Sequence, residues 1–399
     1  MRNMLTNTIR KNIRYFLFIL TALSMFVVIE GMARVGMFLY TGNKIYLTYF
    51  NSYKPLNVFN TKVEHHQAGK NIYYKGIPNL SYNDNNVTIT YNSKGFRSDE
   101  FDKTPKKIRI ACFGGSSTWG AGNNGKETWP AYLHEHLEKI FPDSFEVINA
   151  GFGGYNTTTI KNLIKEEFTY YKPDIIIIYS GYNDHTGGLA GGLPNITRSS
   201  SDISIWINNI HRYISSKSVF YYASHRFLNK GNPLNAIRTG ERIVQMYNNN
   251  MNVIISICKE KNIRLVLVKQ PLYCKSTVDS SAESGLEYEK YYKQPFFNTE
   301  TFNKIKEDFI EKVNHAKYGR TYYYQSLIFR ELEKFNQSIH DIVAIDFVND
   351  FLAFQEESKL LFTDVVHLSK EGNNLLSRMI LDNNEFKDIL KSYFKKYNY

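Results

Sequence analysis

The stretch from Ala111 to Trp129, ACFGGSSTWGAGNNGKETW, places a glycine-rich turn directly after an apolar run. It carries two candidate chemistries. Gly120 to Lys126, GAGNNGK, is one residue short of the phosphate-binding pattern G-x-x-x-x-G-K-S/T. Gly114 to Thr118, GGSST, offers instead a serine on a turn at the end of a strand. The rest of the chain decides between a nucleotide-binding loop and a nucleophile turn.

Five short apolar runs recur from Lys107 onward, with helical patterns between them. They are IRIACFG (108–114), FEVINAG (145–151), DIIIIYSG (174–181), IRLVLVKQP (263–271) and IVAIDF (342–347). Near-continuous apolar strands separated by helices are typical of a parallel sheet that is covered on both faces. The sequence therefore predicts an α/β domain built on a five-stranded parallel sheet.

The segments between the later strands are much longer than ordinary loops or single crossover helices. We therefore expect helical insertions at about 185–262 and 273–340, which form a cap or side layer over the sheet. One helix is evident in the first insertion, because apolar residues recur there at three- and four-residue spacing and make a single stripe. The stripe consists of Val244, Tyr247, Met251, Ile254 and Cys258.

Three parts of the chain follow from this organisation. Residues 1–40 are expected to form a cytoplasmic tail and a transmembrane anchor, and residues 106–399 the domain that carries the sheet. Residues 41–105 are expected to be an extension that packs on this domain. The alternating stretch VTITYNSKGF within it predicts a short hairpin or an edge strand.

The phosphate-loop interpretation fails on spacing. Such a loop has its glycines immediately after the strand, so that backbone N–H groups and the next helix N-terminus point at the phosphates. Here the strand ends near Gly114, and the next candidate glycine is Gly120. Glu127 stands where the pattern requires a magnesium-binding Ser or Thr. We therefore expect no nucleotide and no other cofactor, and we interpret Lys126 as a loop cation.

Side chains suited to acyl transfer follow four of the predicted strands: Ser116, Gly154, Asn183, and then Asp364 with His367. Open parallel sheets place their ligand sites at these carboxyl ends. A serine hydroxyl needs a base to take its proton, which His367 can do near neutral pH. Asp364 can accept the other ring N–H and stabilise the imidazolium. The Ser116 and Gly154 N–H groups and the Asn183 amide can donate to the oxyanion of a tetrahedral intermediate.

In this order and strand context, Ser116, Gly154, Asn183 and His367 resemble the four sequence blocks of the SGNH/GDSL hydrolase superfamily. The resemblance covers about residues 107–381. It implies a flavodoxin-like, three-layer α/β/α sandwich, a serine esterase activity, and an oxyanion hole formed by the three donors. A different class of serine hydrolase, the α/β-hydrolases, requires G-x-S-x-G, and Thr118 occupies the position of its last glycine.

Two further features of the sequence concern the comparison with this superfamily. The Asp that usually precedes the serine in the superfamily is Gly115 here. Its absence removes a carboxylate that helps to order the turn, so we expect an effect on the rate more than on the mechanism. Asn92 to Arg97, NSKGFR, resembles a segment that precedes the first block in anchored bacterial relatives, and the sequence alone assigns no chemistry to it.

The composition adds little about partners. The chain has 49 Lys+Arg against 38 Asp+Glu, but these residues are scattered without a dense basic run, so we expect no nucleic-acid partner. Cys112, Cys258 and Cys274 show no CxxC spacing and are odd in number, which indicates neither a zinc site nor a disulfide framework. The histidines of His134–His136 and His65–His66 lack metal-ligand spacing, so we expect no metal site.

The N-terminal region predicts a membrane anchor. Residues 15–29, YFLFILTALSMFVVI, carry no charge. At about 1.5 Å per residue they fall short of a bilayer core of about 30 Å, so the span is expected to continue through Glu30 towards Ala33. The preceding residues carry cations and no acid, which favours a cytoplasmic N-terminus and an extracytoplasmic domain. These cations are Arg2, Arg10, Lys11 and Arg14.

A cleaved signal peptide is the alternative, although Gly31-Met32-Ala33 is a poor cleavage site. The favoured interpretation is thus an anchored, extracytoplasmic esterase that acts on acyl esters, above all O-acetyl esters, of envelope carbohydrate. Three alternatives stay open: a lipase or lysophospholipase, an O-acyltransferase of envelope polysaccharide, and a non-catalytic envelope binding protein. The acyl acceptor and the oligomeric state do not follow from the sequence.

Overall fold

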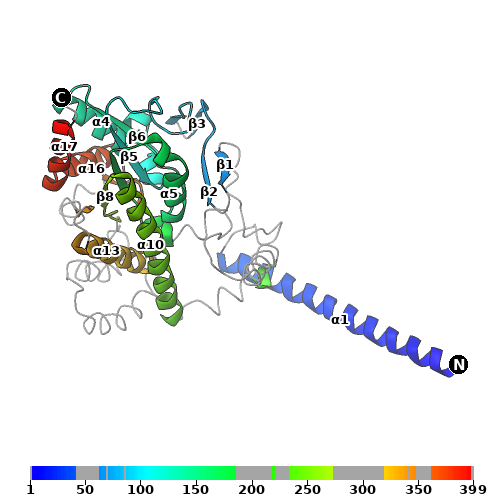
Figure 1. Cartoon of the computed structure of the whole chain (residues 1–399). Coiled ribbons are helices and arrows are strands. Elements are labelled where there is room, and N and C mark those ends of the chain that lie inside the picture. The colour runs from blue at the N-terminus through cyan, green and yellow to red at the C-terminus, as the bar shows by residue number, and fades with distance from the viewer. Residues whose placement is uncertain are drawn as a thin grey trace. The chain divides into compact units, whose positions relative to one another are not determined.

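The computed structural model describes residues 2–41, 63–68, 71–84, 87–185, 218–221, 233–272, 319–338, 342–346 and 361–396. The chain divides into two units (Figure 1). The first comprises Met1–Pro55 and Arg198–Asn232 and contains the helix α1 (Arg2–Thr41). The second comprises Leu56–Thr197 and Pro233–Tyr399 and contains all the strands.

The five predicted strands are present and form one parallel sheet in the order β6-β5-β7-β8-β9. Nearly all their residues are buried, because helices cover both faces. The strands are β5 (Ile108–Gly114), β6 (Phe145–Asn149), β7 (Ile175–Tyr179), β8 (Arg264–Val268) and β9 (Ile342–Ile345).

Alternate residues of each strand enter two separate cores. In β5, Ala111 and Phe113 face one core, and Ile108, Ile110 and Cys112 face the other. The first core is covered by α5 (Thr157–Leu163), α10 (Pro233–Lys261) and α13 (Gly319–Ser338). The second is covered by α4 (Trp129–Ile140), α16 (Lys370–Asp382) and α17 (Asn384–Lys396). The predicted three-layer α/β/α sandwich is confirmed.

The strand order fixes where a site can form. The chain passes from β5 to β6 on one side and later returns to β7 on the other side of β5. A reversal of this kind opens a crevice at the carboxyl ends of the two central strands. Ser116 follows β5 and Asn183 follows β7, so both residues lie at this crevice.

The helix expected within the first insertion is α10, and four residues of its predicted stripe, Tyr247, Met251, Ile254 and Cys258, are buried. It packs against α5, β8 and α13, and α13 packs against β9. The helices α10 and α13 are therefore crossover helices of the outer layer, which corresponds to the second of the two predicted arrangements, a cap or a side layer. Apart from residues 185 and 218–221, the remainder of 185–262 and 273–340 lies outside the described residues.

The extension forms two antiparallel hairpins, β1 (Val63–Ala68) with β2 (Asn71–Gly76) and β3 (Ser81–Asp84) with β4 (Val87–Thr90). The strand β4 is the start of VTITYNSKGF, so the predicted hairpin is present. Aromatic residues of the extension enter the first core and pack on Phe152 and Phe168 of the sheet domain. The described part of the extension thus shares the core of the second unit.

Candidate active site

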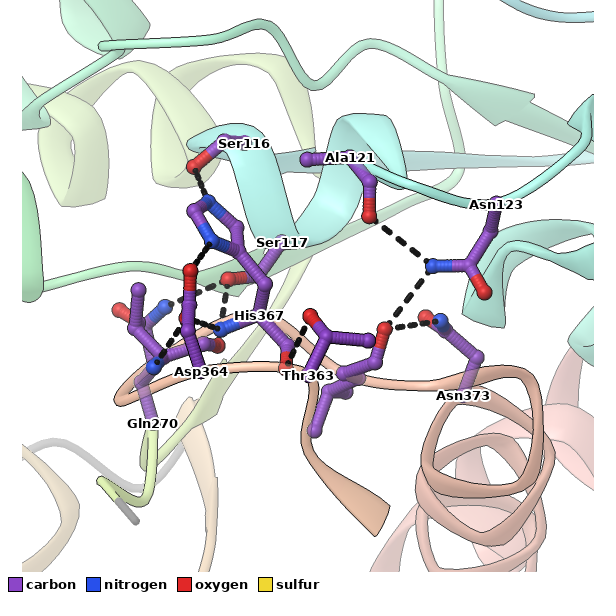
Figure 2. Close-up of polar contacts among 11 residues, drawn as sticks. Ser116, Ser117, Ala121, Asn123, Gln270, Thr363, Asp364, His367 and Asn373 are labelled. Carbon is purple, nitrogen blue, oxygen red and sulfur yellow. Dashed lines mark hydrogen bonds and ion pairs between the residues drawn. The ribbon is translucent and has the colours of Figure 1, made fainter. Parts of the chain in front are cut away.

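Ser116 begins a one-turn helix, α3 (Ser116–Trp119), at the carboxyl end of β5. Gly114 ends the strand and Gly115 is the N-cap of the helix. This turn presents the serine at the edge of the sheet where open α/β folds bind their ligands. Figure 2 shows the Ser116 side chain directed at the imidazole ring of His367.

The neighbouring GAGNNGK segment serves as a connection into α4. Asn124 and Glu127 form a capping box around a short 3-10 helix (Gly125–Glu127), in which the Asn124 N–H donates to Glu127 Oε2 over 3.1 Å. Lys126 is exposed on this helix. The residues that looked like a phosphate loop therefore cap each other and lead the chain away from β5.

The structure brings His367 and Asp364 to Ser116 (Figure 2). Ser116 Oγ lies 2.6 Å from His367 Nε2, and Asp364 Oδ2 lies 2.6 Å from His367 Nδ1. Because a carboxylate only accepts hydrogen bonds, Asp364 selects the tautomer that carries its proton on Nδ1. His367 Nε2 is then free to accept the proton of the Ser116 hydroxyl.

Asp364 is organised by its own loop. Its Oδ1 accepts the Val366 N–H over 2.9 Å and the His367 N–H over 2.8 Å. Partial burial pushes the pKa of Asp364 upward, but the hydrogen bonds from the His367 ring and these two N–H groups outweigh it and lower the pKa to about 2. The carboxylate is therefore ionised throughout the neutral pH range.

A set of buried amides and hydroxyls ties the His367 loop to the serine turn, and the sequence had not suggested them. Ser117 Oγ donates to the Val366 carbonyl over 2.9 Å and accepts from Gln270 Nε2 over 3.3 Å. Asn123 Nδ2 donates to the Leu368 carbonyl over 2.9 Å (Figure 2). The residues on either side of His367 are thus both held by the segment that carries Ser116.

The other two predicted site residues lie beside the same turn. Gly154 has a φ of 82°, in the left-handed region that favours glycine. Asn183 Nδ2 donates to the Tyr155 carbonyl over 2.9 Å, so the amide is held next to the Gly154 loop. It keeps a second hydrogen for another acceptor, since an amide nitrogen carries two.

Steric contact with Asn183 explains why residue 115 is a glycine in this chain. A Cβ placed on Gly115 would lie only 2.4 Å from Asn183 Nδ2. The absence of a side chain therefore allows the Asn183 amide to approach the serine turn. The expectation that Gly115 merely removes an ordering carboxylate was incomplete, because the same glycine makes room for an expected oxyanion donor.

Asp184, the neighbour of Asn183, is buried and joins the loops after β6 and β7. Its carboxylate accepts the Thr157 N–H over 3.1 Å and also the Thr157 hydroxyl. Burial raises the pKa of Asp184 to about 7, against the opposing effect of the bonds from Thr157. The SGYND segment thus provides one amide for the site and one carboxyl group that caps α5.

Arg97, the last residue of NSKGFR, donates hydrogen bonds to the backbone of the serine turn. Its guanidinium donates to the carbonyls of Trp119 and Gly120, each over 2.8 Å, and to that of Asn123 over 2.5 Å. Burial lowers the pKa of Arg97 to about 10, so the group stays charged at neutral pH. The sequence pattern NSKGFR pointed to this residue, although its role became visible only in the structure.

Comparison with known proteins is consistent with this arrangement. Residues 112–285 match the GDSL-like lipase/acylhydrolase family. Ser116, Gly154 and Asn183 lie within the matched segment, and Asp364 and His367 lie beyond it. No protein among the curated sequences matches the chain.

Several solved structures are similar over much of the chain. The acetyl xylan esterase AlAXEase is 17% identical, with 68% of this chain and 98% of that chain covered and a TM-score of 0.39. A catalytic mutant of an acetylxylan esterase from Geobacillus stearothermophilus is 15% identical, with 69% and 92% covered and a TM-score of 0.36. A two-domain esterase active on acetylated mannans is 14% identical, with 71% and 50% covered and a TM-score of 0.37.

The family match falls on the strands and turns that carry the first three blocks of the predicted motif order. The fold around them is the parallel three-layer sandwich that this motif order implied. The match assigns residues 112–285 to a GDSL-like lipase/acylhydrolase segment, and together with the fold it supports the SGNH/GDSL hydrolase superfamily and an activity on ester bonds.

Proposed function

We propose that Ser116, His367 and Asp364 form the catalytic triad of a serine esterase. The observation that carries the proposal is the pair of 2.6 Å contacts that joins Ser116 Oγ to His367 Nε2 and His367 Nδ1 to Asp364 Oδ2. His367 takes the hydroxyl proton as Ser116 Oγ attacks the ester carbonyl carbon. Asp364 orients the ring and stabilises the imidazolium that forms.

The attack turns the carbonyl oxygen into an oxyanion. In this proposal the oxyanion receives hydrogen bonds from the Ser116 and Gly154 backbone N–H groups and from Asn183 Nδ2. The intermediate collapses when His367 returns its proton to the leaving alcohol, which leaves an acyl group on Ser116. Water, activated by His367 in the same way, then releases the acid and restores the serine.

Labelling by a fluorophosphonate tests the nucleophile. The wild-type protein should be labelled once at Ser116, and Ser116→Ala should lose both the label and ester hydrolysis, because loss of a triad nucleophile costs several orders of magnitude. Ser81→Ala is the control, since it removes an exposed hydroxyl on β3 and should keep the label. Activity above about one per cent of wild type in Ser116→Ala would contradict the assignment.

We propose that the substrate is a short acyl ester, above all an acetyl ester, carried on envelope carbohydrate. The net charge of +11 supports this proposal, since a basic surface suits the acidic glycans of an envelope. The 30 tyrosines, whose rings could pack on sugar faces, lend little further support. Many of the described tyrosines are buried in the core, among them Tyr73, Tyr74, Tyr91, Tyr155, Tyr179 and Tyr247.

A series of nitrophenyl esters of increasing acyl length separates this substrate from a lipid ester. For the proposed enzyme, kcat/KM should be highest with acetyl or propionyl. A lipase with a matched acyl tunnel would gain about 0.8 kcal/mol per buried methylene, so its kcat/KM would rise several-fold per methylene. An optimum at eight or more carbons, with no acetate released from acetylated xylan, would favour the lipid ester. Adding a sugar acceptor to the assay tests acyl transfer, which would transfer the acetyl group to the sugar.

We further propose that α1 anchors the enzyme with its catalytic unit outside the cytoplasmic membrane. The segment Ile13–Leu39 has a mean hydropathy of 2.2 and is long enough to span a bilayer. Glu30 accepts hydrogen bonds from Ser218 Oγ and from the N–H groups of Val219 and Phe220, so its carboxylate is satisfied within the first unit. Cleavage after Ala33 would remove these contacts, which supports a retained helix.

Protease accessibility tests the topology. Protease added to intact spheroplasts should digest the catalytic unit, and a carbonate wash should leave the protein in the membrane. Protection from the protease would indicate the reverse orientation. Release of a shortened protein into the medium would indicate a cleaved signal peptide.

A further inference from the structure

We propose that Tyr74, on β2 of the N-terminal extension, is a positioning residue that sets the orientation of the oxyanion donor Gly154. This inference rests on the proposed esterase mechanism. It gives the extension a function in catalysis in addition to its packing on the sheet domain.

The Tyr74 hydroxyl is within reach of the Gly154 loop. It donates a hydrogen bond to the Gly153 carbonyl over 2.8 Å, and the Tyr155 hydroxyl donates back to the Tyr74 carbonyl. The Tyr74 ring packs edge-on against Phe152 and Tyr155, with ring centroids 5.3 and 5.1 Å apart. Residues 152–155 are thus fixed to β2 by two hydrogen bonds and two ring contacts.

The bond to Gly153 acts on Gly154 because both belong to one peptide group. The Gly153 carbonyl and the Gly154 N–H share a planar trans peptide, so they point in opposite directions. When Tyr74 holds the carbonyl on its own side, the Gly154 N–H must point away from the extension. In the described part of the chain this N–H has no backbone acceptor, which leaves it available to an oxyanion.

This peptide needs a hydrogen bond that fixes its orientation, because it lies between two glycines. Glycine occupies positive and negative φ with similar ease, so a peptide between Gly153 and Gly154 has little intrinsic preference for one orientation. In the flipped orientation the Gly153 carbonyl would face the oxyanion and repel it. Burial raises the pKa of Tyr74, so the phenol keeps its proton and remains a donor.

The position of Tyr74 is itself fixed by polar contacts on either side of it in β2. Asn71 Nδ2 donates to Glu166 Oε1 over 2.6 Å, and Lys75 Nζ donates to Glu167 Oε2 over 2.9 Å. Both glutamates lie on the helical segment that follows the Gly154 loop. The hairpin is therefore attached to the sheet domain independently of the bond that Tyr74 makes to Gly153.

Tyr74→Phe tests the inference because it removes only the hydroxyl and keeps the ring contacts. We expect kcat to fall about 10- to 100-fold, less than or comparable to direct loss of an oxyanion donor, while KM changes less than about two-fold. The rate should be expressed per active site titrated to completion with a fluorophosphonate. A partly misfolded preparation would then lower the titre and leave kcat unaffected.

Tyr179→Phe is the matched control. Tyr179 is also fully buried, and its hydroxyl has no hydrogen-bond partner among the described residues, so its loss should leave kcat per titrated site unchanged. An unchanged kcat in Tyr74→Phe, or an equal loss in both variants, would overturn the inference. The proposed function fails separately, through a wild-type protein that neither hydrolyses esters nor takes the label at Ser116.

Discussion

The two sides of the active site are built in different ways. The Asp364 and His367 side chains are oriented within their own loop, although Ser117 and Asn123 hold the loop in place. The Asp364 side chain accepts the Val366 and His367 N–H groups, and the Thr363 N–H donates to the His367 carbonyl over 2.9 Å. The turn that carries Ser116 is organised by residues far away in the sequence. Its supports include Arg97, which donates to the Trp119 and Gly120 carbonyls, and Gln270, which donates to Ser117 Oγ.

The difference follows from what each group must do. An imidazole and a carboxylate three residues apart can find each other within one tight loop, so half of Asp364 can stay exposed without loss of geometry. In the proposed site the three oxyanion donors follow three different strands, so their convergence on one point depends on the tertiary fold. The geometry of the Asp364–His367 pair is therefore set within one loop, whereas the geometry around Ser116 depends on tertiary contacts.

The largest expected loss of activity is at His367, and the loss at Asp364 should be smaller. His367→Ala should lower kcat/KM by roughly 10⁴-fold or more, and Asp364→Ala by about one to two orders of magnitude less, because the aspartate only orients and stabilises the ring. Since the pKa of Asp364 is lowered to about 2, the carboxylate stays ionised between about pH 5 and 8, and its charge does not change over this range. Activity of His367→Ala within about ten-fold of wild type would contradict this assignment of the base.

Gly115→Asp should be next in size. It restores the residue usual in the superfamily, yet we expect kcat to fall about 10- to 100-fold, because a Cβ at this position meets the Asn183 amide at 2.4 Å and would displace the proposed oxyanion donor. The displaced atom is the end of a side chain, so stability should change little. Gly125→Ala is the control, since nothing lies within 4 Å of a Cβ there. Wild-type activity in Gly115→Asp would show that Asn183 does not need its present position.

Arg97→Lys tests how far the serine turn depends on remote support. A lysine cannot donate to three carbonyls in the geometry of a guanidinium, so we expect the free energy of unfolding to fall by about 2–4 kcal/mol, with kcat lower by only a few-fold. Urea denaturation measures the first quantity. The control Lys126→Ala removes an exposed cation from the same region and should leave stability unchanged. Equal stability of Arg97→Lys and wild type would contradict the inferred role.

The smallest effect on activity is expected at Asp184. Its pKa in the folded protein is about 7, above the value of about 3.9 in an unfolded chain, so the native state binds the proton more tightly. This group therefore contributes stability at low pH that is lost as the pH rises from about 4 to 7. Asp184→Asn should remove that part of the pH dependence, as measured by urea unfolding at pH 5 and 8. An identical pH dependence in the two proteins would mean that Asp184 is ionised in the fold.

The same division explains what could be predicted from the sequence. The five strands were predicted because each is a near-continuous apolar run, and Ser116, Asn183 and His367 were found because each follows a strand end. The supports of the serine turn and of the Gly154 loop were missed, since nothing local to Gln270 or Tyr74 indicates which loop its side chain contacts. The sequence also did not explain why residue 115 is a glycine. The explanation is the short distance between Gly115 and the Asn183 amide, which exists only in the folded chain.

The helix that follows the Gly154 loop contains a π turn, η3 (Ile164–Phe168), which holds one residue more than an α-helical turn. Glu166 and Glu167 lie on this turn, and both bond to β2. Each residue of a helix turns the chain by about 100°, so deleting one residue here would rotate at least one of these carboxylates away from the hairpin. A change of a single residue in length, far from Ser116 in the sequence, would thus loosen the strand that carries Tyr74. Under the proposed role of Tyr74, the length of this helical segment would therefore affect the rate of catalysis.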